Sequence, residues 1–209
     1  MKIMLTTLAL SLLLLGCGTT RSLQCPFEPE QMQQSNQLTQ LIGEWELYTV
    51  NDEKQPEKFL GSLFFARSGN TISEHWLTVQ MVHEENGKKI MHPPCRGRGA
   101  DIDGETFLAL SMDLPKLAQM ASVSDPGNLA IPVYLLLRLI PAGKGSFVVE
   151  GITYAKYQNS KWEKLDPSLQ ITEDGLVLND AASQLQLLRK KKFAAQGVMY
   201  LQTVAETKN

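Results

Sequence analysis

Apolar and polar side chains alternate with a period of two along much of the chain from residue 43 onward. Trp45 and Leu47, for example, alternate with Glu44 and Glu46. Successive side chains of a β-strand point to opposite faces, so this alternation predicts a strand with one buried face. Comparable runs predict further strands at residues 59–66, 72–83, 88–91, 96–102, 105–112, 131–140, 146–157, 168–172, 176–178, 183–188 and 198–204.

Tight-turn sequences separate many of these runs. Asn86-Gly87, Asp103-Gly104 and Asp174-Gly175 are two-residue hairpin signals. Short strands joined by tight turns at intervals of about 8–12 residues are typical of antiparallel folds. We therefore expect a mainly β fold, an antiparallel up-and-down barrel or sandwich of about 8–10 strands. Sequential hairpins favour the barrel, because closure removes exposed strand edges.

Two segments outside this alternation predict short helices. Residues 31–40 are rich in Gln and lead into the first strand. Asp113-Leu114-Pro115 supplies an N-cap and a first-turn proline for a helix at 116–121. We therefore expect one or two short helices beside the strands.

The first residues form a different kind of segment. Met1-Lys2 is a positively charged start, and residues 3–15 are apolar apart from two threonines and a serine. A helix of about 13 residues is roughly 20 Å long, well short of the ~30 Å hydrocarbon core of a bilayer. The segment is therefore typical of a secretory signal peptide rather than of a membrane span.

The signal segment ends in Leu14-Leu15-Gly16-Cys17. This sequence resembles the lipobox of bacterial lipoproteins, which has a Leu at −3, a small residue at −1 and a required Cys. The resemblance implies diacylglycerol on the Cys17 thiol, cleavage after Gly16 and an acylated new N-terminus. Because Gly18 follows instead of Asp, it also implies anchoring in the outer membrane, facing the periplasm. An ordinary signal peptide with a chance Cys is the alternative.

Domain boundaries follow from these segments. We expect a lipoprotein signal peptide at 1–16, a lipidated N-terminus and tether at 17–42, and a single β-rich periplasmic domain at 43–209. The tether assignment depends on the polar, proline-containing composition that follows Cys17.

Composition narrows the classes of function. The chain has 20 Lys and Arg against 22 Asp and Glu, a net charge of −2, so no broad basic surface is available for nucleic acid. Its 43% apolar and 20% charged residues are typical of a globular domain. The most apolar internal run, residues 131–140, contains Pro132 and Arg138 and predicts a buried strand.

Residues 41–47, Leu-Ile-Gly-Glu-Trp-Glu-Leu, resemble the Gly-x-Trp first-strand motif of lipocalin-like barrels. The resemblance implies that Trp45 closes the base of the barrel beneath an Arg from near the last strand. Arg189 is the residue that could fill this role, and Gly43 would permit close approach of the entering segment. Small β-domains of heat-shock and envelope lipoproteins also open with Gly-x-Trp. Trp45 as an ordinary core aromatic is a further interpretation.

Cys25 and Cys95 are the two cysteines that remain once Cys17 is acylated. In an oxidising periplasm such a pair readily forms a disulfide. The bridge would close a loop of about 70 residues and stabilise the fold by up to ~4 kcal/mol. We therefore expect a Cys25–Cys95 disulfide, with two free thiols as the alternative.

His75, His83 and His92 are the candidate metal ligands. His75 and His83 share a strand face but lie roughly 26 Å apart at ~3.3 Å per residue. The Asn86-Gly87 turn pairs His83 with Ile90 and places His83 and His92 diagonally on one face, roughly 7–8 Å apart at the backbone. A third firm ligand is missing, so we expect two solvated histidines and neither a metal nor a cofactor.

The sequence contains no nucleophile elbow, Walker loop or zinc-protease motif. We therefore expect a protein that is not an enzyme: a lipid-anchored accessory or interaction module whose partner is another envelope protein. A lipocalin-like binder of a small apolar or amphipathic ligand is the alternative, and a hydrolase using Asp101 and Asp103 is a third. A basic run at 189–192 could touch anionic head groups, although a solvated strand end is the simpler interpretation. A filled barrel interior would favour the interaction module and a hollow one the ligand binder.

Overall fold

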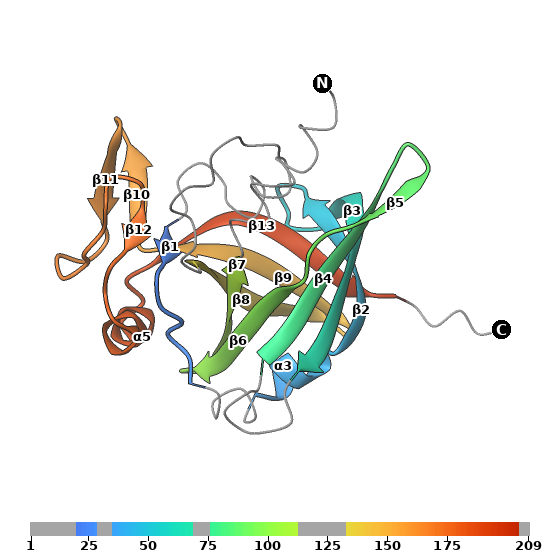
Figure 1. Cartoon of the computed structure of the whole chain (residues 1–209), viewed down its shortest axis with the longest axis horizontal. Helices are drawn as coiled ribbons and strands as arrows, with labels where there is room; N and C mark the ends of the chain where they lie inside the picture. The colour runs from blue at the N-terminus through green and yellow to red at the C-terminus, as the bar shows by residue number, and fades with distance from the viewer. Residues whose placement is uncertain (1–19, 29–34, 69–75, 113–132, 205–209) are drawn as a thin grey trace.

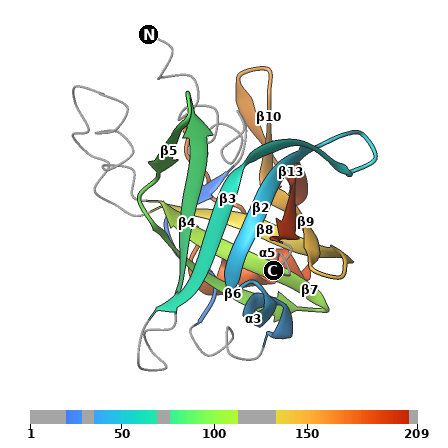
Figure 2. The same cartoon turned by 90° about the vertical axis from the view of Figure 1, so that its right-hand side faces the viewer.

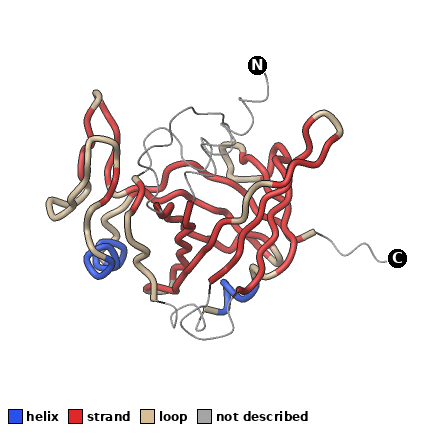
Figure 3. Tube along the Cα trace, in the orientation of Figure 1, coloured by secondary structure: helices blue, strands red, loops and turns tan. Residues whose placement is uncertain are grey.

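The computed structural model describes residues 20–28, 35–68, 76–112 and 133–204, which form a β-barrel with a smaller group of elements on one side (Figures 1 and 3). In chain order the elements are β1 (Arg21–Ser22), α3 (Asn36–Gln40), β2 (Gly43–Val50), β3 (Pro56–Ser68), β4 (Trp76–Glu85), β5 (Lys88–Met91), β6 (Cys95–Ile102), β7 (Glu105–Met112), β8 (Val133–Gly143), β9 (Ser146–Thr153), β10 (Ala155–Gln158), β11 (Lys161–Lys164), β12 (Leu176–Val177), α5 (Ala181–Arg189) and β13 (Ala194–Thr203).

Eight of these strands close into an antiparallel barrel (Figure 2). The order around the barrel is β8-β7-β6-β4-β3-β2-β13-β9, and β9 also pairs with β8. Apart from β5, which extends the hairpin of β4, each barrel strand pairs with the next one along the chain. β13 closes the barrel between β9 and β2. The expected mainly β fold with short helices is confirmed, and the barrel is the architecture adopted.

Side chains on the two faces of the barrel wall pack in two separate hydrophobic cores. The inner core consists of Leu38, Leu41, Trp45, Leu47, Phe65, Leu77, Val79, Met81, Leu108, Leu110, Val133, Leu135, Leu137, Leu139, Phe147, Val149, Met199 and Leu201. The outer core lies on the other face of β6 to β9 and consists of Phe27, Ala100, Ile102, Phe107, Ala109, Leu136, Ile152, Tyr154, Ala155, Leu169, Val177, Leu187 and Leu188. The segment between β9 and β13, which we call the outer unit, carries β10, β11, β12 and α5 and supplies much of the outer core (Figure 1).

The N-terminal segment belongs to the folded domain. Thr20 is only 3% exposed. Its backbone N–H donates to Thr153 Oγ1 at 3.2 Å, and its hydroxyl accepts the backbone N–H of Tyr154 at 3.0 Å. β1 then pairs with β12 and β8, and Phe27 is buried in the outer core. The domain is therefore already folded at Thr20.

This placement corrects the expected tether at 17–42. In its described part that range packs on the barrel, because its apolar side chains have a core to enter: Phe27 in the outer core, Leu38 and Leu41 in the inner core. Composition alone does not distinguish a polar tether from a polar segment that carries a few well-placed apolar anchors.

α3 covers one end of the barrel. The hydroxyl of its N-cap Ser35 accepts the Leu38 N–H at 3.1 Å and donates to Asp101 at 2.9 Å. A Cβ atom on Gly99 would lie closest to the Phe107 carbonyl oxygen on β7, as well as 2.7 Å from Leu38 Cδ1, so only glycine fits between β7 and the helix. Asp101 also accepts the Thr106 hydroxyl at 2.5 Å. Asp101 therefore fixes the helix on the barrel.

The strand expected at 183–188 is wrong, because this segment lies in the helix α5. Asp180 is its N-cap, and the Asp180 carboxylate accepts the backbone N–H three residues further on at 2.7 Å. Gln184, Leu187 and Leu188 are buried, a spacing that places them on one face of a helix. The expected helix at 31–40 is α3 in its described part, and the one at 116–121 lies outside the described residues.

Candidate functional site

Trp45 closes the barrel near α3. Its side chain is 2% exposed, and its indole N–H donates to the Leu41 carbonyl oxygen at 2.7 Å. Its ring centroid lies 5.5 Å from that of Phe147 on β9. A buried indole whose N–H is paired contributes apolar packing without a desolvation cost. Trp45 is therefore a core residue at the base of the barrel.

The other two residues of the expected barrel-closing set act differently. Gly43 has φ +128°, and a Cβ atom there would meet no other atom within 4 Å. Its backbone conformation, not close packing, is what favours glycine. Arg189 is an exposed residue at the end of α5. Because α5 lies outside the barrel, the expected stacking of Arg189 on Trp45 is wrong, and Phe147 contacts the indole instead.

Cys25 and Cys95 lie on opposite sides of the barrel wall. Cys95 pairs with Val79 in the ladder between β4 and β6, which places it on the inner face. Cys25 packs against the outer core. The expected disulfide is therefore wrong, and the structure contains no bond between these two thiols. Burial raises the pKa of the Cys25 thiol to about 11, which makes it a poor nucleophile at neutral pH.

His83 and His92 form a pair on the inner face of the β4–β5 hairpin. The expected register is confirmed, since His83 pairs with Ile90 and the His92 backbone N–H donates to the Met81 carbonyl at 2.9 Å. The side chains approach more closely than expected, because His83 Nδ1 and His92 Nε2 are hydrogen-bonded at 2.8 Å. The expected solvated histidines are wrong for His92, which is 8% exposed.

The surroundings of His92 favour the neutral form of its imidazole. Burial, and then the proximity of His83, lower the pKa of His92. A hydrogen bond between two imidazoles needs a donor N–H on one ring and a lone pair on the other, so it is lost when both rings are protonated. His83 Nε2 is buried without a hydrogen-bond partner. In the described part of the chain no group of three or more His, Cys, Asp or Glu could hold a metal ion.

A cluster of charged side chains lies on the outer face of the barrel wall. Glu150 on β9 is 2% exposed and accepts hydrogen bonds from Lys54 at 2.9 Å and from Arg138 Nε at 3.1 Å. Arg138 also contacts Glu105 at 3.1 Å, and its guanidinium lies 5.6 Å from the Phe193 ring centroid. Burial would raise the pKa of Glu150, but the hydrogen bonds from Lys54 and Arg138 outweigh it and hold the pKa below its usual value.

Sequence analysis did not identify this cluster. The signal was available, because Glu150 and Arg138 each interrupt a long apolar run. An ionisable residue within such a run is rarely buried without a partner of opposite charge. The two residues face each other in the ladder between β8 and β9, and Glu150 joins the β2–β3 turn to the barrel through Lys54.

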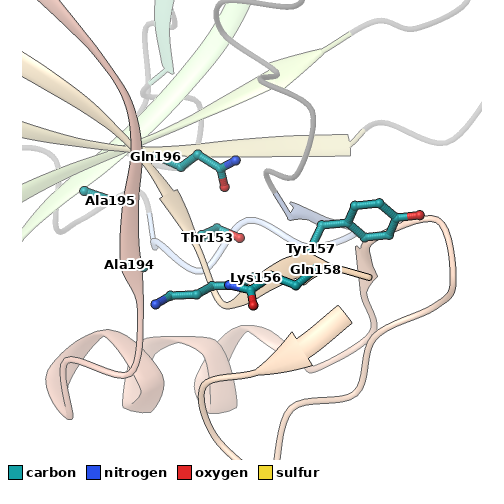
Figure 4. Close-up of a pocket in the computed structure, with 7 residues that line it drawn as sticks. All are labelled: Thr153, Lys156, Tyr157, Gln158, Ala194, Ala195 and Gln196. Carbon is teal, nitrogen blue, oxygen red and sulfur yellow. The ribbon is translucent and has the colours of Figure 1, made fainter. Parts of the chain in front are cut away.

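A pocket of about 260 Å³ lies outside the barrel, between β10 and the beginning of β13 (Figure 4). Its lining residues are Thr153, Lys156, Tyr157, Gln158, Ala194, Ala195 and Gln196. Tyr157 is 50% exposed, and its ring centroid lies 5.1 Å from that of Trp162 on the neighbouring strand. The pocket adjoins Thr153, which holds Thr20, so it lies where the N-terminal segment joins the domain.

Two predicted residues fall outside the described part of the chain: Cys17, the expected lipidation site, and His75. Among the described residues, no helix has the length and apolar character needed to cross a bilayer.

No protein-family model, curated protein or solved structure matches this chain. The resemblance to lipocalin-like barrels therefore holds at the level of architecture, which is a closed eight-stranded antiparallel barrel with Trp45 at its base.

Proposed function

We propose that this protein is a lipid-anchored lipoprotein of the bacterial outer membrane whose periplasm-facing barrel binds another envelope protein and has no enzymatic role. The observation that carries the proposal is the apolar packing inside the described part of the barrel. The hydrophobic cluster of the inner core contains 18 buried side chains. A lipocalin-type site would need a pocket of at least ~300 Å³, and apolar packing of this extent favours a protein partner over a ligand inside the barrel.

The outward-facing aromatic side chains of β2 and β3 support a protein partner. The outer core covers the outward faces of β6 to β9, whereas β2 and β3 carry aromatic side chains on theirs. Tyr48 and Phe59 form an edge-to-face pair with ring centroids 5.6 Å apart, and Phe59 is 49% exposed. Phe64 on the same strand is 38% exposed. Exposed aromatic residues grouped on one face are typical of protein-binding surfaces.

Photocrosslinking in the living envelope tests this proposal. A benzoylphenylalanine at position 59 or 64 should give discrete protein adducts, and the same probe in the Asp103-Gly104 turn is the matched control. Adducts of equal yield at all three positions, or at none, would contradict a binding surface on β2 and β3.

The lipid anchor is tested separately. Cys17→Ser should abolish palmitate labelling and leave the precursor uncleaved by the lipoprotein-specific peptidase. Normal palmitate labelling of this variant would refute the anchor and leave the binding surface to be judged by crosslinking.

The His83–His92 pair favours a second candidate function, binding of a small amphipathic ligand. Both side chains lie on the inner face, where the rest of the core is apolar. A fluorescent fatty-acid probe distinguishes the two functions. We expect no saturable binding to the native protein. Saturable binding to the native protein, lost in His92→Leu, would favour the ligand binder.

A further inference from the structure

We propose that the β10–β11 hairpin is a membrane-contact element, and that it docks on the anionic phospholipid head groups of the leaflet that holds the lipid on Cys17. This inference rests on the proposed lipid anchor and adds the face that the domain turns toward the bilayer.

The first step is the short distance between the anchor and the folded domain. Thr20 is fixed by its hydrogen bonds to Thr153 and Tyr154, and only two residues separate it from Cys17. Three fully extended residue steps span at most about 11 Å. The part of the surface around Thr20 must therefore stay close to the head groups in any orientation of the domain.

The hairpin begins at this same point. Thr153 and Tyr154 lead directly into β10, so the residues that fix Thr20 also fix the base of the hairpin. In Figure 1 the hairpin rises from the side of the barrel where β1 lies, and the segment that follows β1 runs in the opposite direction. A hairpin of four residue pairs extends about 13 Å from its base. Its tip can therefore reach a surface that lies within the length of the anchor.

The side chains of the hairpin suit the interfacial region of a bilayer. Tyr157 and Trp162 are paired directly across the two strands, and the Trp162 indole N–H donates to the Glu173 carbonyl at 2.9 Å. Lys156 and Lys161 are exposed on the opposite face of the hairpin, where Glu163 lies across from Lys156, and Lys164 is exposed on the aromatic face. Tyr and Trp are enriched at the level of the head groups, where their rings are half solvated, and Lys attracts anionic lipids.

Charge is distributed along the chain in a way that favours the same orientation. Residues 155–192 carry seven Lys and Arg against five Asp and Glu, whereas the rest of the chain carries 13 against 17. Within this segment the hairpin itself, residues 155–164, carries three Lys and one Glu. An anionic leaflet therefore attracts the hairpin.

The test uses the full-length lipidated protein in phosphatidylcholine vesicles, with and without phosphatidylglycerol. A benzoylphenylalanine replaces Ser160 at the hairpin tip, and lipid adducts are quantified by mass spectrometry. The control probe replaces Lys144, which lies in the turn before β9, whereas the hairpin follows β9. We expect lipid adducts at position 160 that increase with phosphatidylglycerol, and none at position 144.

Charge reversal sharpens the test. Each lysine near an anionic surface is worth about a fivefold change in affinity. With the probe at position 160, Lys161→Glu should lower the adduct yield at least fivefold, whereas Lys144→Glu, an equal change in charge, should leave it within twofold.

The outcomes separate the two proposals. A protein that carries no N-terminal lipid and does not associate with vesicles refutes the lipid anchor. A protein that is acylated and vesicle-bound, but gives equal lipid adducts at positions 160 and 144 or none at position 160, overturns the docking of the hairpin and leaves the anchor intact.

Discussion

β2 and β9 lie in one barrel, separated by a single strand, and bury their side chains in different ways. On β2, Trp45 and Leu47 are buried while Glu44 is exposed. This alternation is typical of a strand that has one solvent-exposed face. On β9 every residue from Ser146 to Thr153 is buried. The difference arises because the outer core covers the outward face of β9. Alternation along a sequence therefore identifies strands at the surface of a fold, and a continuous apolar run identifies strands between two cores.

The largest loss of stability is expected when a buried side chain of the inner core is removed. Trp45→Ala should destabilise the domain by about 3–5 kcal/mol and lower the melting temperature markedly, because a large buried ring is lost from the base of the barrel. Phe64→Ala, on the exposed face of the neighbouring strand, is the control and should melt close to the native protein. A native melting temperature for Trp45→Ala would contradict its place in the core.

Removing a buried side chain of the outer core should cause a smaller and more local loss of stability. Leu187→Ala in α5 removes a side chain that is 3% exposed and should cost about 2–4 kcal/mol. Hydrogen exchange should accelerate in α5 and β12 and remain slow in β2 to β4, because the inner core keeps its contacts. Uniform acceleration over the whole barrel would show that the two cores unfold as one unit.

The ion cluster of Glu150, Lys54 and Arg138 on the outer face of the barrel wall predicts a dependence of stability on pH. The folded-state pKa of Glu150 lies below its usual value, so its carboxylate stabilises the protein fully above the ordinary pKa and less as the pH falls through the folded value. Glu150→Gln should cost about 1–3 kcal/mol at neutral pH and make stability less dependent on pH in the acid range. Glu163→Gln on the exposed hairpin is the control. Equal acid sensitivity of native and Glu150→Gln proteins would argue against the cluster.

The smallest expected effect is that of reduction on the melting temperature, because Cys25 and Cys95 lie on different faces of the barrel wall. Because the thiols are not bonded to each other, a reducing agent should leave the melting temperature of the mature protein unchanged. Alkylation of the denatured protein without prior reduction should modify both thiols. A mass two hydrogens below that of the dithiol would instead reveal a disulfide.

The barrel could be predicted from the sequence largely because its tight turns have recognisable two-residue sequences. The Asn86-Gly87 turn correctly gave the register of His83 with Ile90, and the hairpin at Asp103-Gly104 lies between β6 and β7 as expected. Local chemistry determined these features, since a two-residue turn allows only one pairing of the flanking strands.

The face of the barrel wall on which a residue lies, and the distant residues that it contacts, could not be predicted in the same way. Cys25 and Cys95 were suitable partners by their number and by the oxidising compartment expected from the sequence. The face on which each residue lies, however, depends on packing between distant segments. Residues 183–188 alternate well enough for a strand, but the cap at Asp180 and the outer core favour a helix. The bond between the His83 and His92 rings was missed because strand spacing fixes backbone separation and not the reach of the side chains.

Closure of the barrel by β13 has a consequence for biogenesis. β13 pairs with β2 and β9, so contacts that define the ring join residues about 150 positions apart in the sequence. Until β13 has paired, β2 and β9 each present an unpaired edge, and such edges are templates for aggregation. Pairing over so long a separation also makes folding slow compared with helical domains of similar size. The folding chain therefore passes through an open-sheet stage in which a holding chaperone would be of most benefit.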